Sequence, residues 1–425
     1  MGLVFYNIFL FLYGTGIRLA AIFSSKARKW VTGRQNIWEK LTTEMADQQS
    51  KVIWVHCASL GEFEQGRPII ERLKVDYPNY KLVLTFFSPS GYEIRKNYEK
   101  ADWVFYLPMD SAYNAKIFLE IVRPSLVIFV KYEFWYYYLK QINHQKIPLL
   151  LISALFRESS IFFKWYGGLH RKMLSFFDQL FVQNESSHKM LASIKLDGKS
   201  TIAGDTRFDR VIQIAENFLS IPAIEKFVEH GKKTIVAGST WPADEELLQR
   251  SLLALHDSAS LQLIIAPHEI NKEHLSQLQQ LFPGSLLFSQ LVAGNQPDSL
   301  PSTGNILIID NIGMLSRLYK YATISYIGGG FGKGIHNTLE AAVYGSPVLF
   351  GPNYKKFNEA IDLITAGGAI SINDPKEGVR AIEAFMHDEI TYNKACEKSK
   401  EYVYANRGAA ERILNYIQEK RLLTN

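Results

Sequence analysis

The fold is constrained most by a series of short, continuous apolar runs that recur along almost the whole chain. The runs are rich in Val, Ile, Leu and Phe, and the segments between them have helical spacing. Such runs are typical of strands buried on both faces, and their alternation with helices indicates parallel sheets covered by helices. The runs lie at residues 52–57, 82–87, 126–130, 149–152, 180–182 and 201–203, and again at 234–237, 261–265, 306–309, 322–327, 347–350 and 369–372.

A pause in this pattern predicts a domain junction. Between residues 209 and 231 the strand signals give way to a mainly helical stretch that contains Pro222. A chain of 425 residues is too long for one ordinary core and suggests two domains of about 150 to 200 residues. We predict an α/β chain with two doubly wound, Rossmann-like domains at 31–212 and 213–400. A segment at 1–30 precedes them, and a C-terminal helix at 401–425, able to cross back onto the first domain, follows.

The first segment differs in kind from the rest. Residues 3–17 are apolar and uncharged, and cations follow at Arg18, Lys26, Arg28, Lys29 and Arg34. A secretory signal carries its cations before the apolar run, so this segment is expected to stay attached. Three readings are open: a span that includes residues 19–23, a helix lying in the membrane interface, or a helix docked on the protein's own core. Cations on this flank keep the main body cytoplasmic.

Composition excludes some classes of protein. The net charge of +5 is mild, so a nucleic-acid binder is not indicated. Cys57 and Cys396 match no disulfide or metal spacing, and we predict that both are buried packing residues.

A glycine-rich stretch at residues 328–334 follows one apolar run and precedes a predicted helix at 337–345. Such a strand–turn–helix unit can bind an anion through backbone N–H groups at the helix start. It contains no G-x-G-x-x-G motif and no P-loop, which disfavours a Rossmann dehydrogenase and a P-loop NTPase. Glu340 shares a helix face with Asn337, where its carboxylate could accept both hydroxyls of a ribose. A simple tight turn is the alternative.

Further candidates follow the other runs, because ligands of parallel sheets sit beyond the carboxyl ends of the strands. Glu62 follows the first run, although an ordinary first-turn glutamate is the alternative. The pair His268-Glu269 does not begin an H-E-x-x-H zinc motif, because Lys272 stands where histidine is needed, and we expect no metal. Residues 155–172 interleave aromatics with cations, which suits a lipid interface or an anionic amphiphile but lacks the broad positive field of a nucleic-acid site.

Several ordered motifs between about residues 51 and 372 resemble the 3-deoxy-D-manno-octulosonic acid (Kdo) transferases of Gram-negative bacteria. They are Trp54-Val55-His56 with Ala58-Ser59-Leu60-Gly61-Glu62, Glu133-Phe134-Trp135, Gly204-Asp205-Thr206-Arg207-Phe208-Asp209, Gly238-Ser239-Thr240, Gly328-Gly329 with His336-Asn337-Thr338-Leu339-Glu340, and Phe350-Gly351-Pro352.

The resemblance implies a GT-B glycosyltransferase fold with an interdomain cleft, and transfer of Kdo from CMP-Kdo to a lipid A precursor. It places the protein at the cytoplasmic face of the inner membrane, held by an N-terminal anchor. The implied reaction is an inverting displacement that needs no metal or other cofactor. Other readings are a GT-B transferase with a UDP-sugar donor, and a membrane-tethered glycolipid-binding module without catalysis.

The resemblance also implies roles for individual residues. Glu62 matches the general base and Arg207 a cation that steadies the leaving phosphate, with Glu133 and Lys131 as further catalytic candidates. Lys131 stands where the family commonly has a carboxylate, and His268-Glu269 where it commonly has Arg-His. The expected acceptor contacts are Ser59, Gly61, Arg157 and Lys164. The expected CMP contacts are Ser239, Thr240, His268, Glu269, Ile312, Gly313, Met314, Gly334, His336, Asn337, Thr338, Leu339, Glu340, Asn358 and Glu359.

Overall fold

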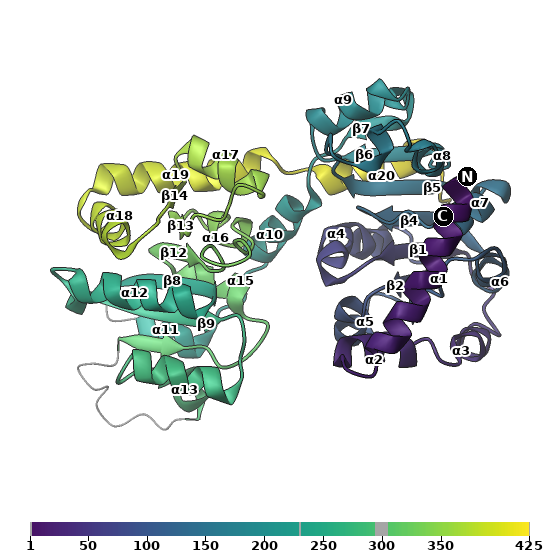
Figure 1. Cartoon of the computed structure of the whole chain (residues 1–425). Helices are drawn as coiled ribbons and strands as arrows, with labels where there is room; N and C mark the ends of the chain where they lie inside the picture. Colours follow the sequence, from purple (N-terminus) through teal and green to yellow (C-terminus); the bar gives the residue numbers. More distant parts are fainter. Residues whose placement is uncertain (1, 229–230, 294–304, 425) are drawn as a thin grey trace. The chain divides into compact units, whose positions relative to one another are not determined.

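The computed structural model describes residues 2–228, 231–293 and 305–424 and divides into two compact units (Figure 1). The first unit comprises residues 1–210 together with 407–425, and the second comprises residues 211–406. Each unit contains one seven-stranded parallel sheet among its described residues.

The first unit begins with helices that precede its sheet and ends with a helix from the C-terminus of the chain. Its elements are α1 (Gly2–Ala20), α2 (Ser25–Thr32), α3 (Ile37–Glu44), β1 (Val52–Cys57), α4 (Leu60–Asp76), β2 (Lys81–Phe86), α5 (Pro89–Arg95), β3 (Trp103–Tyr106), α6 (Ala112–Val122), β4 (Pro124–Val130), α7 (Tyr136–His144), β5 (Leu149–Ala154), α8 (Gly168–Ser175), β6 (Gln179–Val182), α9 (Glu185–Ser193), β7 (Ser200–Ile202), α10 (Thr206–Glu216), which crosses the junction, and α20 (Ala409–Glu419).

The second unit repeats the alternation of strands and helices. Its elements are α11 (Pro222–Val228), β8 (Lys233–Thr240), α12 (Pro242–Ala254), β9 (Leu261–Pro267), α13 (Lys272–Leu281), β10 (Leu286–Leu287), α14 (Phe288–Val292), β11 (Ile306–Ile308), α15 (Leu315–Leu318), β12 (Ile324–Ile327), α16 (Leu339–Ala342), β13 (Val348–Phe350), α17 (Asn358–Ala366), β14 (Ala369–Ser371), α18 (Pro375–His387) and α19 (Glu389–Ala405).

The apolar runs are continuous because both faces of each sheet are covered by helices. Along β1, Val52 and Trp54 join a core cluster with residues of α3, α6 and α7. The alternate residues Ile53 and Val55 join a second cluster with residues of α4 and α20. The two-residue side-chain period of a strand sends neighbours to opposite faces, and here each face meets a packed helix layer.

The order of the strands identifies where ligands are expected in each unit. The first sheet has the order β3-β2-β1-β4-β5-β6-β7, and the second has the order β10-β11-β9-β8-β12-β13-β14. The order reverses between β1 and β4 in one sheet and between β8 and β12 in the other. Ligands of doubly wound sheets bind beyond the carboxyl ends of the strands at such a switch point.

The last helix returns to the first unit. Ala410 and Ile413 of α20 are buried in the core cluster that contains Ile53. The carboxylate of Asp209 accepts hydrogen bonds from the backbone N–H groups of Gly408 and Ala410, at 2.6 and 2.9 Å. The last residue of the 204–209 motif therefore caps a helix that lies two hundred residues further along the chain.

Every apolar run forms a strand, but three expectations need correction. The apolar runs did not predict β3, a short edge strand, or β10, which has two residues. The helix expected at 337–345 is only the four residues of α16, because the preceding backbone folds back on itself: the N–H of His336 bonds to the carbonyl of Gly328. Cys57 is fully buried as predicted, whereas Cys396 is only partly buried.

Candidate active site

Glu62 lies in the first turn of α4, directly beyond the carboxyl end of β1. Ser59 is the N-cap residue of this helix, and the pair has the S-x-x-E spacing of a capping box. The Ser59 hydroxyl makes no capping hydrogen bond to the backbone and donates instead to the carboxylate of Glu62. The carboxylate is partly exposed and lies at the switch point of the first sheet. It is therefore available to accept a proton there.

Glu133, beyond the neighbouring strand β4, is held by a chain of buried hydrogen bonds. His56 Nε2 lies 2.9 Å from Glu133 Oε2, and His56 Nδ1 lies 2.8 Å from the hydroxyl of Thr85. Trp54 Nε1–H donates to that hydroxyl at 2.8 Å. A carboxylate only accepts, so Nε2–H of His56 donates to Glu133. In the neutral tautomer Nδ1 is then an acceptor, and it accepts from the Thr85 hydroxyl, which itself accepts from the indole.

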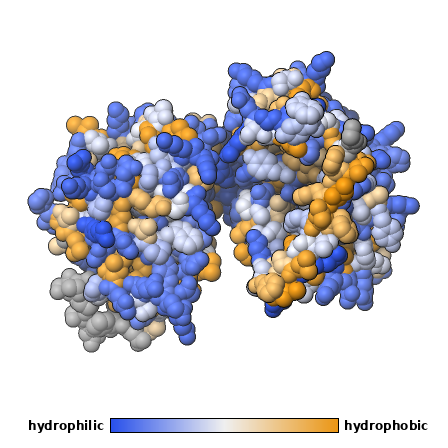
Figure 2. All heavy atoms as spheres, in the orientation of Figure 1, coloured by the Kyte–Doolittle hydropathy of each residue, from blue (hydrophilic) through white to orange (hydrophobic). Residues whose placement is uncertain are grey.

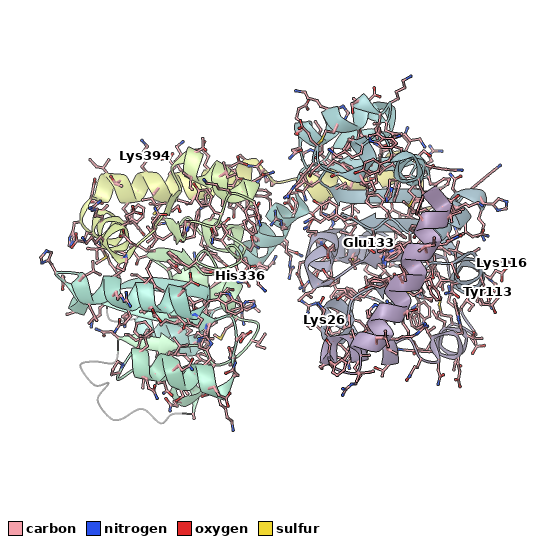
Figure 3. The ribbon with its side chains drawn as sticks, in the orientation of Figure 1. Lys26, Tyr113, Lys116, Glu133, His336 and Lys394 are labelled. Carbon is pink, nitrogen blue, oxygen red and sulfur yellow. The ribbon has the colours of Figure 1, made fainter. Side chains whose placement is uncertain are left out.

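Trp135 donates its indole N–H to the same carboxylate oxygen at 2.6 Å. Glu133, which is labelled in Figure 3, is 8% exposed, so these bonds fix its orientation. His56 is fully buried, and it supports Glu133 from within the core.

Three charged candidates surround Tyr132. Loss of water raises the pKa of this phenol, Arg157 lowers it, Glu62 raises it and Arg207 lowers it. All three charges influence the pKa of Tyr132. The predicted base Glu62, the predicted phosphate-binding Arg207 and the predicted acceptor contact Arg157 therefore lie near one side chain. Tyr132 itself was not singled out from the sequence; its place next to the 133–135 motif is the signal that could have found it.

Arg207 and Lys131 have constrained geometry. The guanidinium of Arg207 donates from Nε and from a terminal nitrogen to Asp205, at 2.9 and 2.6 Å. Lys131 has a left-handed backbone, with φ of 68°, and its ammonium lies over the ring of Tyr132, 5.3 Å from the centroid. The lysine in place of a carboxylate therefore adds positive charge to the group around Tyr132.

The other expected acceptor contacts are positioned differently. Gly61 is exposed in the first turn of α4, beside Glu62. The Lys164 carbonyl accepts from Arg171 at 2.8 Å, which ties down the segment after β5. Trp165 and Tyr166, which follow Lys164, are 90% and 59% exposed. The aromatic residues of this segment are thus divided between the core and solvent.

In the second unit, the glycine-rich turn follows β12 and packs against the end of β8. A side chain at Gly328 would collide with the carbonyl of Ser239, and one at Gly330 would collide with the backbone of Gly351. Buried Asp244 braces the turn by accepting from the N–H of Gly329 at 2.9 Å and from the hydroxyl of Tyr326 at 2.8 Å. The glycines are required for close backbone packing.

His268 and His336, which are both predicted to bind CMP, lie in a row of rings with Trp241 beside the glycine-rich turn. The ring of Trp241 lies 4.7 Å from that of His268, which lies 4.6 Å from that of His336. Trp241 Nε1–H donates to Nε2 of His336 at 3.4 Å. Burial and the neighbouring His268 lower the pKa of His336 to about 4, so this imidazole is neutral at physiological pH and its other nitrogen carries the proton.

The predicted ribose-binding glutamate lies beside Asn337 as expected, although Asn337 precedes α16 instead of sharing a helix face with it. Asn337 Nδ2 donates to Glu340 Oε1 at 3.0 Å, so the two side chains are neighbours. Glu340 is partly exposed, whereas the side chains of Thr338 and Leu339 are fully buried. Any ligand contact of the latter two must therefore come from their backbone.

The remaining expected CMP contacts are spread over the same edge of the second sheet. Thr240 is buried and donates its hydroxyl to Glu245 at 2.8 Å, while Ser239 is only partly buried. Ile312 is 91% exposed, next to Gly313 with φ of 101°, whereas Met314 is buried. Other contacts expected from the sequence are Glu269, which is exposed, Gly334, which is partly buried, Asn358, which is exposed, and Glu359, which is buried.

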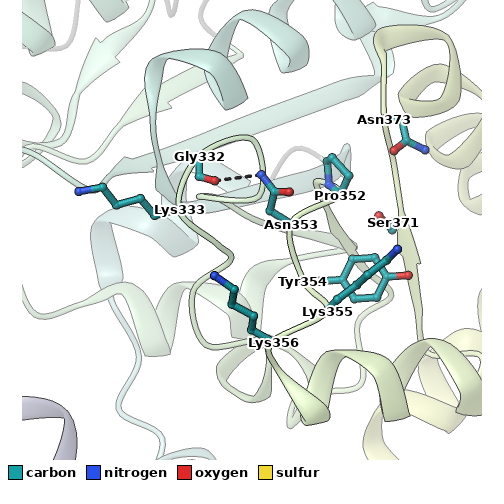
Figure 4. A pocket seen from close by; sticks show the side chains of 9 residues that line it. All are labelled: Gly332, Lys333, Pro352, Asn353, Tyr354, Lys355, Lys356, Ser371 and Asn373. Carbon is teal, nitrogen blue, oxygen red and sulfur yellow. Dashed lines mark hydrogen bonds between the residues drawn. The ribbon is translucent and has the colours of Figure 1, made fainter. Parts of the chain in front are cut away.

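A cavity of about 890 Å³ lies beside this edge (Figure 4). Gly332, Lys333, Tyr354 and Asn373 are among its lining residues. None of the residues expected to contact CMP lines it. The cavity therefore adjoins the glycine-rich turn without containing the predicted nucleotide contacts.

His274, in the helix that follows His268 and Glu269, is held by a buried carboxylate. His274 Nε2 lies 2.9 Å from Glu245 Oε2, and Nδ1–H donates to the carbonyl of Glu269. Burial lowers the pKa of His274, but the hydrogen bond and charge of Glu245 outweigh it and raise the pKa overall. Among the described residues, no three His, Cys, Asp or Glu side chains are arranged to hold a metal ion.

Comparisons with known proteins agree on a family. A family model described as 3-deoxy-D-manno-octulosonic-acid transferase (kdotransferase) matches residues 35–210, most of the first unit. The 3-deoxy-D-manno-octulosonic acid transferase of Haemophilus influenzae is 24% identical over 86% of this chain and 86% of its own length. That of Aquifex aeolicus is 27% identical over 75% of this chain and 80% of its own.

Solved structures show the same fold at low identity. A UDP-GlcNAc 2-epimerase from Neisseria meningitidis is 18% identical with a TM-score of 0.62, over 87% of this chain and all of its own. The MurG of Acinetobacter baumannii is 12% identical with a TM-score of 0.53, over the same shares. The two doubly wound units thus have the GT-B fold, and the motifs, the family model and the curated relatives agree that this chain is similar to the 3-deoxy-D-manno-octulosonic acid transferases, which are glycosyltransferases.

Proposed function

We propose that this enzyme transfers Kdo from CMP-Kdo to a lipid A precursor in lipopolysaccharide synthesis, by a single inverting displacement with Glu62 as the general base. The observation that carries the proposal is the carboxylate of Glu62. It stands at the switch point of the domain that the family model matches, and it accepts a hydrogen bond from the hydroxyl of Ser59.

The residues of the first domain suit this chemistry. A sugar hydroxyl is a weak nucleophile until a base removes its proton, and Glu62 is the base in reach of the site. Ser59 orients the Glu62 carboxylate through its hydroxyl. Glu133, fixed by His56 and Trp135, supplies a second oriented carboxylate that can hold a hydroxyl of the acceptor.

Negative charge accumulates during the reaction, because Kdo carries a carboxylate and CMP leaves as a phosphate monoester. Cations and backbone N–H groups stabilise such charge in a transition state. Arg207 and Lys131 are the cations that we assign to this role in the first domain. The mechanism assigns the cytidylate to the second domain, where Glu340 binds the ribose and neutral His336 donates a hydrogen bond.

The N-terminal helix supports a membrane location. One helix of the described residues, α1, is long and apolar enough to cross a membrane. In this structure it lies along the first unit: the hydroxyl of Tyr6 donates to buried Asp110 at 2.6 Å, and that of Tyr137 donates to Asn7 at 2.9 Å. Its other face is apolar and exposed, as the orange band in Figure 2 shows. We assign α1 to the cytoplasmic face of the inner membrane, lying in the interface.

The experiment that tests the proposal compares Glu62→Gln with Glu64→Gln, which removes a carboxylate from the same helix. Both proteins are incubated with CMP-Kdo and an acylated glucosamine disaccharide, and products are read by mass. Glu62→Gln should bind CMP normally and lose transfer by at least about a hundredfold, as expected for a general base. Glu64→Gln should stay within a few-fold of the unaltered enzyme.

Near-normal transfer by Glu62→Gln would remove Glu62 from the mechanism. Transfer from a UDP-sugar in place of CMP-Kdo would replace the proposed donor, and failure of the unaltered enzyme to release CMP would favour a binding module without catalysis.

A further inference from the structure

A second cavity lies in the first unit, outside every residue assigned to the reaction. It has a volume of about 270 Å³ and lies between α1, α2 and the loop after β2. Its walls include Tyr13 and Ile17 of α1, Ala27 and Trp30 of α2, Phe87 of the loop, and Pro89, which begins α5. We call this cavity the α1–α2 slot.

The walls of the slot are apolar and held in place. The ring centroids of Tyr13, Trp30 and Phe87 lie 5.7 to 6.1 Å from one another. Arg34 braces two of these residues from behind: its guanidinium lies 3.9 Å from the centroid of Trp30 and donates to the carbonyl of Phe87 at 2.7 Å. A cavity with fixed aromatic walls is suited to an apolar ligand.

The polar edge of the slot is cationic. Lys26, at the start of α2, lines the cavity and is exposed (Figure 3). Within the described residues it makes no salt bridge or side-chain hydrogen bond. Arg28 and Lys29 follow it on the same helix. A ligand that combines an apolar chain with an anionic group therefore matches both parts of the slot.

The slot also adjoins the exposed apolar face of α1. Phe5, Phe11 and Leu12 are 61% to 72% exposed, and Leu10 is the buried residue of this helix. Ile17, in contrast, is only partly exposed and faces the slot. An amphiphile in contact with that face of α1 is close to the slot.

The other end of the slot is close to both candidate carboxylates. The ring of Phe87 lies 4.6 Å from that of Trp135, which donates to Glu133. The N–H of Ser88 donates at 2.7 Å to the carbonyl of Ala58, the residue before Ser59. The slot is thus separated from Glu133 by the two neighbouring rings of Phe87 and Trp135 and from Glu62 by one short turn.

We infer that the α1–α2 slot binds one acyl chain of the acceptor, with an anionic group of that acceptor near Lys26. This inference rests on the proposed function, because it names how the lipid acceptor is held. A methylene group is about the size of a water molecule, which takes about 30 Å³ of liquid, so the slot accepts roughly nine methylenes. Binding there positions the acceptor sugar beside Glu62 and makes acylation a requirement for tight binding.

The kinetic test fills the slot with a bulky side chain. Ile17→Trp places an indole in the cavity, and the matched control Leu19→Trp places one on the exposed face of the same helix, where Leu19 is 61% exposed. Ile17→Trp should raise the KM for an acylated disaccharide at least about tenfold, equal to roughly two methylenes left in water, with kcat nearly unchanged. Transfer to the deacylated disaccharide should be the same in all three proteins.

A second comparison addresses the cationic edge. Lys26→Glu should raise the KM for the acylated, phosphorylated acceptor, whereas Lys29→Glu, one turn later and outside the slot, should not. Equal KM values for the acylated acceptor in Ile17→Trp and Leu19→Trp would overturn the inference while leaving the proposed function intact.

A binding measurement separates failure of the inference from failure of the proposed function. A single-chain acyl phosphate with a brominated chain should quench the fluorescence of Trp30, and the quenching should be lost in Trp30→Phe and weakened in Lys26→Glu. If the donor assignment is wrong, this quenching persists while transfer from CMP-Kdo is absent. Absence of quenching would overturn the inference, as would equal quenching by vesicles of brominated phosphatidylglycerol, which would assign the slot to bulk lipid.

Discussion

The buried histidine under the candidate site allows a sharp test of how Glu133 is oriented. His56 bonds through Nε2 to Glu133 and through Nδ1 to Thr85. The amide nitrogen of a glutamine side chain can take the place of Nε2, whereas an asparagine reaches only the position of Nδ1. His56→Gln therefore preserves the donor to Glu133, and His56→Asn removes it.

The expected loss follows from the bond that is removed. A hydrogen bond to a charged group contributes about 1.5 to 3 kcal/mol, and the site is buried, so the donor is not replaced by water without cost. If Glu133 must keep its orientation for transfer, His56→Asn should lower kcat by roughly 10- to 150-fold. His56→Gln should stay within a few-fold of the unaltered enzyme.

The assay is transfer from CMP-Kdo to an acylated disaccharide under single-turnover conditions, together with the thermal unfolding midpoint of each variant. The reasoning predicts similar unfolding midpoints for the two variants and different rates. Equal losses of rate in both variants, in proportion to lost stability, would show that His56 only fills the core.

Three further predictions concern the carboxylates that hold the fold around the sites. Burial raises the pKa of Asp110 to about 6 despite the hydrogen bond from Tyr6. The contribution of the protonated Asp110 to stability is therefore fully present below about pH 4 and is lost as the pH rises through 6. Relative to Asp110→Asn, the free energy of unfolding should increase by about 3 kcal/mol between pH 7 and pH 4, which unfolding midpoints would measure. Asp244→Asn should weaken CMP binding about tenfold in calorimetry, because the N–H of Gly329 or another donor loses its acceptor. Unchanged affinity would show that the glycine-rich turn does not bind the nucleotide. Asp209→Ala should lower the free energy of unfolding by about 1 kcal/mol and speed hydrogen exchange in residues 409–419, because α20 loses its cap. Unchanged protection from exchange in those residues would show that α20 needs no cap.

Local chemistry made much of the fold readable. Apolar runs such as 52–57 cannot be exposed on either face, so a covered parallel sheet was the consistent prediction, whereas the order of the strands, and with it the switch points, came from the structure. The glycines at 328–334 predicted a turn where the backbone packs closely, and the structure shows that larger residues would collide there. The pairing of Asn337 with Glu340 was also predicted, although Asn337 precedes α16 and the contact joins the turn to the helix.

Contacts between distant segments could not be read in this way. Nothing near His56 in the sequence shows that it supports Glu133, and nothing near Asp209 shows that it caps a helix beginning at Ala409. The short length of α16 also has a distant cause, since Asp244 and the end of β8 hold the turn that precedes it.

The sequence by itself determined the alternation of elements, the two domains and the loops in which chemistry is expected, because these depend on the period of apolar residues and on glycine and helix-start chemistry, which act over a few neighbouring residues. The tertiary structure alone decided which side chains from separate strands share a hydrogen-bond chain, and where α1 and α2 leave a slot between aromatic walls. Those arrangements depend on packing between segments far apart in the chain, for which no local pattern carries a signal.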